Sequence, residues 1–192
     1  MKGFHALVAG LVALLVLGIV VRVMSLQKFN NFQSSAQAWL DLDRSVYDCS
    51  DDDGIAKPAD PYEMLKAVGP RITMARTLAA IAATDLAELK QQMASSSNPD
   101  QVRTDFLLKP SNRRFHSTID RRLNVPQLEA LRDATLAYNT KGNPIHDALA
   151  LLPGYIDGIV ADMRTTATLR SEIFPQGIPS DGLSGLRLPP PQ

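Results

Sequence analysis

Four arginines lie within ten residues of this chain, and their charge is the clearest candidate for binding. They are Arg113, Arg114, Arg121 and Arg122. On a helix, Arg113 and Arg114 would lie on the same side as Arg121. Such a face could bind anionic lipid headgroups or an acidic partner. The favoured alternative is a solvated helix face whose arginines pair with Asp105 and Asp120.

An acidic run, Asp51 to Asp53 followed by Gly54, resembles part of a calcium-binding loop. Such a loop needs carboxylates at positions 1, 3 and 5, glycine at position 6 and Glu at position 12. Aligning Gly54 with position 6 puts Cys49 at position 1 and Asp60 at position 12. We therefore expect a solvated acidic turn rather than a metal site.

The motifs of common catalytic sites are missing from the sequence. No Glu is followed three residues later by His, as a di-iron bundle requires, and the Cys and His residues do not cluster as zinc ligands do. No phosphate loop or Gly-x-Ser-x-Gly elbow occurs. Cys49 lies beside Asp48 and Asp51, which disfavours a thiolate. We expect a non-catalytic protein without metal or cofactor, in which His116 and His146 are surface or half-buried residues.

One apolar run, Ala6 to Val21, contains no charged residue. A helix of about 20 residues spans a bilayer core, so residues 1–24 are predicted to form a transmembrane anchor. The alternative is a signal peptide, but the run is longer than a typical h-region and no good cleavage site follows it. The positive charges of Arg22 and Lys28 on one flank equal those of Lys2 and the amino terminus on the other. We slightly favour an inside amino terminus with the domain on the extracytoplasmic (periplasmic) side.

Small residues four apart in the anchor could support self-association. The pairs are Ala6 with Gly10 and Ala9 with Ala13. Small side chains let helices approach closely in lipid, which makes a homo-oligomer possible. The alternative is that Ala and Gly are simply common in such segments.

The remaining composition predicts an all-α protein. The 20 basic and 20 acidic residues cancel, which argues against a nucleic-acid partner. Residues 25–174 are predicted to form one helical domain, an antiparallel bundle of about four helices. Residues 175–192 form a Pro/Gly-rich extended tail whose Leu183 and Leu186 could dock on a partner or on the bundle.

Turn and cap residues set the expected helix boundaries. The anchor should continue into the domain as one helix, with Trp39 in its buried stripe. Asp60-Pro61 should begin a second helix with Glu63 completing a capping box, and Asn98-Pro99 a third. Gly69-Pro70 is expected to interrupt or kink the second helix, and a break is expected at Pro153-Gly154. The last helical region, 145–174, should bury a stripe of apolar residues: Leu149, Leu152, Ile156, Val160, Met163 and Ala167.

Three short motifs resemble the LemA family. They are Ala38-Trp39-Leu40-Asp41-Leu42-Asp43 after the anchor, which matches an Ala-Trp-x-x-Ile/Leu-Asp pattern, Asp133-Ala134 with Tyr138-Asn139-Thr140, and Phe174-Pro175 followed by Gly185-Leu186 and Pro189 to Pro191. The basic segment that follows the tryptophan in that family is replaced here by Asp48 to Asp60. The resemblance implies a membrane-anchored four-helix bundle in the bacterial envelope, and it supplies no catalytic residues.

These features predict a scaffold or interaction module whose partners are the lipid bilayer and other membrane or envelope proteins. Two alternatives share the fold: an accessory structural subunit of a larger membrane complex, and a small-ligand-binding sensor bundle.

Overall fold

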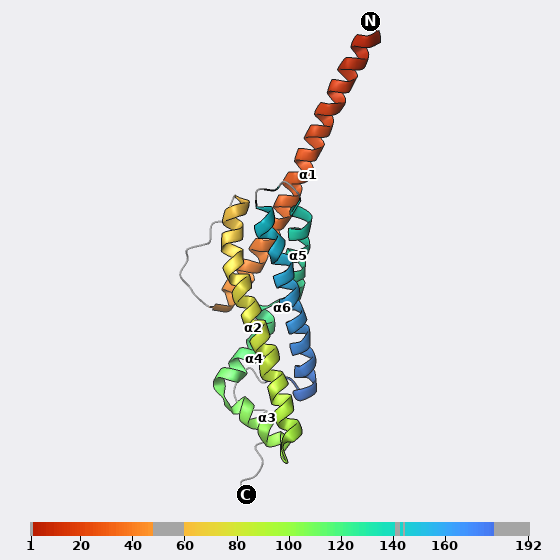
Figure 1. Ribbon diagram of the computed structural model, residues 1–192. Helices are drawn as coiled ribbons and strands as arrows, with labels where there is room; N and C mark the ends of the chain where they lie inside the picture. The colour runs from red at the N-terminus through yellow and green to blue at the C-terminus, as the bar shows by residue number, and fades with distance from the viewer. Residues whose placement is uncertain (1, 48–59, 141–142, 144, 179–192) are drawn as a thin grey trace.

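The computed structural model describes residues 2–47, 60–140, 143 and 145–178, and for 2–11 and 42–47 only the backbone is described (Figure 1). These residues form six helices and no strand, which confirms the all-α prediction for the described part. The helices are α1 (Lys2–Tyr47), α2 (Pro61–Ser95), α3 (Pro99–Leu108), α4 (Pro110–Arg122), α5 (Val125–Tyr138) and α6 (His146–Ile173).

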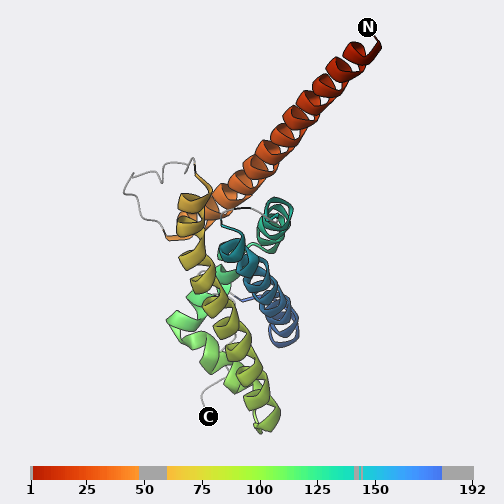
Figure 2. The ribbon, with the colours of Figure 1, turned by 45° about the horizontal axis from the view of Figure 1, so that its top comes forward.

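Helix α1 is one uninterrupted element with two different surroundings. Residues 12–27 are exposed, whereas Phe32, Ala36, Trp39 and Leu40 are buried in the domain. Figures 1 and 2 show the first half projecting beyond the other helices. Among the described residues α1 is the one helix long and apolar enough to cross a membrane, although an N-terminal signal sequence has the same properties.

Side-chain caps begin three of the helices where free backbone N–H groups need acceptors. The Oδ1 atoms of Asp60, Asn98 and Asn124 accept hydrogen bonds from Tyr62, Gln101 and Gln127 at the starts of α2, α3 and α5. Glu63 does not match the predicted capping box; its carboxylate accepts a 2.9 Å hydrogen bond from Lys66.

The expected break at Pro153-Gly154 is wrong, and Gly69-Pro70 does not interrupt its helix. Helix α2 continues through Pro70 and α6 through Pro153. A proline removes one helical hydrogen bond, and burial of flanking residues can compensate for that loss. Val68 and Ile72 flank Pro70, and Leu152 and Ile156 flank Pro153; all four are buried.

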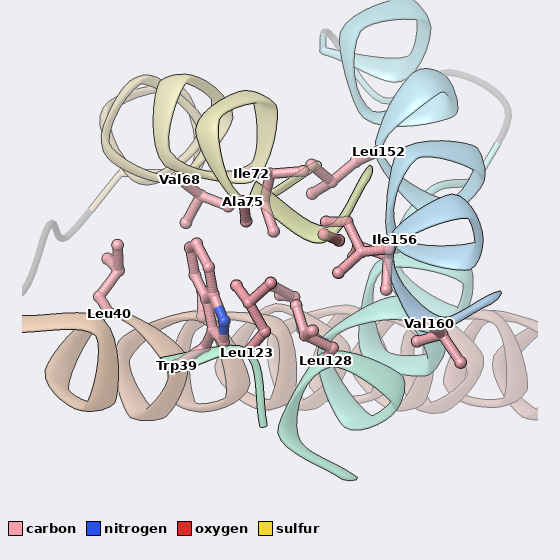
Figure 3. Packing of buried hydrophobic residues seen from close by; sticks show 14 of the residues in the cluster. Trp39, Leu40, Val68, Ile72, Ala75, Leu123, Leu128, Leu152, Ile156 and Val160 are labelled. Carbon is pink, nitrogen blue, oxygen red and sulfur yellow. The ribbon is translucent and has the colours of Figure 1, made fainter. Parts of the chain in front are cut away.

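The main core lies where α1, α2, α5 and α6 meet, with the end of α4 contributing. The ring of Trp39 extends from α1 toward Val68 and Ile72 of the facing α2, and Leu123 lies beside it with Leu128 beyond (Figure 3). Complete burial of a large side chain of this kind contributes about 1.5–3 kcal/mol. Trp39 is wholly buried, as its place in the apolar stripe predicts.

A second, smaller cluster lies at the opposite end of the domain from the exposed half of α1 (Figure 2). It joins α2, α3 and α6 through Leu86, Leu89, Leu107, Ile173 and Phe174. The expected stripe of α6 is otherwise buried, but Ala167 is exposed and Thr166 is buried in its place. Helix α3 thus belongs to the second cluster, whereas the end of α4 enters the main core.

Candidate functional site

The four arginines lie on α4, about halfway along the domain and away from the exposed half of α1 (Figure 1). Arg114 and Arg121 are exposed, and Arg113 and Arg122 are partly buried. The Arg122 side chain approaches the Met74 sulfur at 3.7 Å.

The expected pairing of these arginines with Asp105 and Asp120 is wrong. Asp120 pairs with Arg170 of α6, and Asp105 accepts a 2.7 Å hydrogen bond from Gln101. No ion pair joins Arg113, Arg114 or Arg121 to another described residue.

The other predicted binding residues are only partly within the described structure. Ala6, Ala9 and Gly10 lie on the helical backbone of α1, and their side chains are not described; Ala13 is exposed. Leu183 and Leu186 lie outside the described residues. The last described residue, Ile178, packs against the second cluster, so the start of the tail contacts the domain.

A buried histidine, rather than the arginine face, is the most unusual polar group of the domain. The expectation that His116 is at most half-buried is wrong, since the residue is 1% exposed. Its ring contacts Phe106 of α3 and Phe115 of α4, with centroids 5.4 and 5.0 Å away. Neither ring nitrogen makes a well-formed hydrogen bond within the described residues.

Charged groups from α2, α4 and α6 surround His116. The Nε2 atom lies 3.4 Å from a carboxylate oxygen of Asp85 on α2. Arg170 of α6 pairs through Nη1 with Asp120 of α4, while its buried Nε and Nη2 lack partners among the described residues. Burial lowers the pKa of His116, Asp85 opposes this shift, and Arg170 reinforces it. The lowered pKa favours the neutral form of the ring.

One hollow on the described surface is open to solvent. An open groove of about 580 Å³ runs along α2, lined by Thr73, Arg76, Thr77, Ala80, Ile81, Thr84 and Asp85. Its hydroxyls at Thr73 and Thr77 donate back to the carbonyls of Gly69 and Thr73. Among the described residues no group of three His, Cys, Asp or Glu side chains could hold a metal ion.

The complete burial of His116 was not predicted from the sequence. In the structure the stripe is His116, Ile119 and Leu123, which also follows helical steps of three and four. The histidine at this spacing was the available signal. His146 matches the prediction of a half-buried position, and its Nδ1 lies 2.7 Å from Asn139 Oδ1.

No known protein family, no curated protein and no solved structure matches this chain. The LemA resemblance therefore stays a prediction.

Proposed function

We propose that this chain is a single-pass, membrane-anchored helical bundle that acts as a non-catalytic scaffold or interaction module at the bacterial cell envelope. One observation carries the proposal. In α1 an exposed apolar stretch continues without a break into a stripe that is buried in the domain. A helix that is apolar on all sides is stable when lipid surrounds it.

The domain is suited to present surfaces rather than to hold a substrate. Helix α2 packs against α6, α1 against α5, and α5 against α6, which supports an antiparallel four-helix core as part of the proposal. The arginine face of α4 and the apolar Met74 and Ile81 of α2 are exposed on its sides. These surfaces would bind other membrane or envelope proteins, and the anchor would allow self-association.

The test of the proposal is gentle cross-linking in intact cells, followed by purification of the full chain in mild detergent and identification of what accompanies it. A defined set of other proteins at substoichiometric and variable ratio supports the scaffold. A fixed assembly of constant stoichiometry favours the accessory subunit instead. A monomer or a simple homo-oligomer would contradict the scaffold proposal and direct the search to small ligands.

The anchor is tested separately, because a signal sequence would give the same helix. The mass of the protein purified from membranes should include residues 2–24; loss of this segment from the mature protein would contradict the anchor. For orientation, the sole cysteine is replaced (Cys49→Ser) and exposed Ser97 becomes the label site (Ser97→Cys). We expect a membrane-impermeant maleimide to label it from outside the inner membrane, and protection until lysis would reverse the orientation.

A further inference from the structure

Helices α3 and α4 pack against the rest of the domain at two separate places. The end of α4 enters the main core through Ile119 and Leu123. Helix α3 instead contributes Leu107 to the second cluster, and His116 of α4 lies between the two. We call the unit from Pro99 to His116 the α3–α4 arm. It is held by the second cluster, by Phe115 against the main core, by a hydrogen bond from Arg103 to the carbonyl of Ile173, and by one wholly buried imidazole.

The surroundings of His116 disfavour a positive charge on its ring. Asp120, on the same helix, is paired with Arg170, and Arg170 of α6 repels an imidazolium. From α3 the ring faces Phe106, which carries no charge. The carboxylates of Asp85 on α2 and, more weakly, Asp120 attract an imidazolium. The Asp85 side chain is 40% exposed, so water screens its interaction with the ring. Burial of the ring opposes its charge more strongly.

We propose that the α3–α4 arm is an acid-sensitive element: proton uptake by His116 releases the arm from α2 and α6 while the main core stays packed. The lowered pKa of His116 in the closed arm determines the direction in which opening of the arm depends on pH. An opened arm exposes the ring and restores an ordinary pKa of about 6.5, so the open form binds the proton more tightly. Opening becomes more favourable as the pH falls below about 6.5 and levels off below the pKa of the closed form.

Hydrogen exchange of the full chain in mild detergent tests the proposal. Exchange is followed by mass spectrometry at pH 7.5 and 5.0 and corrected for the intrinsic pH dependence of amide exchange. We expect amides of α3 to open more often at pH 5.0, by at most about tenfold per pH unit because one proton is bound. Amides of α5 should keep their protection.

Two variants assign the effect to one side chain. His116→Phe places a non-titrating ring among Phe106 and Phe115, and it should abolish the acid response of α3. His146→Gln removes the half-buried histidine of α6 and should retain that response. An acid response of α3 that persists in His116→Phe, an unchanged α3 in the wild type, or equal loosening of all helices overturns the proposal.

A measurement on the wild type guards against a misfolded variant. Deuterium exchange at the C2 position of each histidine ring, followed against pH, gives the pKa of His116 without mutation. A value below that of free histidine supports the element. A value at or above about 6.5 would show that the closed arm accepts the proton without penalty and would overturn the proposal.

Discussion

The ring of Phe32 on α1 stacks on the ring of Tyr138 on α5, with centroids 5.5 Å apart and planes inclined by 11°. The ring of Phe29, one turn earlier on α1, contacts the same tyrosine at 5.5 Å. These contacts lie where α1 passes from its exposed half into the domain. They fix α5 to the segment of α1 that directly follows the proposed anchor.

Truncation of Phe32 should strongly weaken the domain. The side chain is wholly buried, so Phe32→Ala removes its transfer free energy and leaves a cavity against Tyr138. We expect the free energy of unfolding to fall by about 3–5 kcal/mol, measured by urea unfolding in detergent with far-UV circular dichroism. The neighbouring exposed Asn31 provides the control, since Asn31→Ala should change it by less than about 0.5 kcal/mol. Equal effects of the two substitutions would contradict this packing.

Tyr138 should make the domain sensitive to alkali. Partial burial raises the pKa of Tyr138, and the hydrogen bond with Asn143 opposes the shift. The folded state therefore holds the phenol proton more tightly than the unfolded state. This stabilisation is complete below pH 10 and is lost as the pH rises from about 10 through the raised pKa. In Tyr138→Phe the melting temperature should depend less on pH between pH 9 and 11. An unchanged slope of melting temperature against pH in this variant would argue against a role of Tyr138 in the alkaline sensitivity.

The capping residues and the buried stripes could be predicted from the sequence because both depend on local spacing. Asp60 and Asn98 cap the helices they were expected to cap, and Trp39 is buried in the stripe that contains it. The helix breaks could not be predicted in the same way. Whether a proline ends a helix depends on the tertiary packing around it, and residues on both sides of Pro70 and Pro153 are buried.

The site was harder to predict than the fold. The sequence shows that Arg113 and Arg121 are close along one helix, but it does not show that Asp120 pairs with Arg170, fifty residues away. The burial of His116 likewise depends on α2, α3 and α6 meeting around it. Long-range contacts of this kind leave no local pattern, apart from the helical spacing of His116 with Ile119.

Pro70 should lower the free energy of unfolding of the domain. Pro70 is exposed in the interior of α2 and denies the helix one backbone hydrogen bond. Pro70→Ala should raise the free energy of unfolding by about 1–3 kcal/mol, as followed by thermal unfolding. Pro99 is the matched control, because it begins α3, where the missing N–H has no helical partner. Pro99→Ala should give no gain, and a similar gain at both sites would refute the explanation.

Asn124 should stabilise α5 through its side chain. Its Oδ1 accepts a 3.1 Å hydrogen bond from the backbone N–H of Gln127. Asn124→Ala should lower the free energy of unfolding by about 1 kcal/mol, while Asn124→Asp, which keeps the acceptor, should stay close to wild type. Chemical unfolding of the three proteins decides the matter, and equal stability of all three would show that the cap contributes nothing.

Reversal of charge on α4 should weaken partner binding while leaving the fold intact. Arg114 and Arg121 are exposed and form no ion pair with another described residue. We expect Arg114→Glu with Arg121→Glu to reduce recovery of cross-linked partners severalfold and to reduce its salt dependence. Lys66→Glu, an exposed reversal near the start of α2, is the control. Unchanged recovery in the α4 variant would leave the arginine face as a solvated surface.

The continuity of α1 also fixes how the domain is rotated about the helix axis relative to the first half of α1. An α-helix turns by about 100° and rises by about 1.5 Å per residue, so one residue inserted between Met24 and Phe29 would swing the domain by that angle about the anchor. Seven inserted residues would nearly restore its azimuth and lift it by about 10 Å. The number of residues between Met24 and Phe29 thus sets the direction in which the arginine face of α4 points relative to neighbours of the proposed anchor.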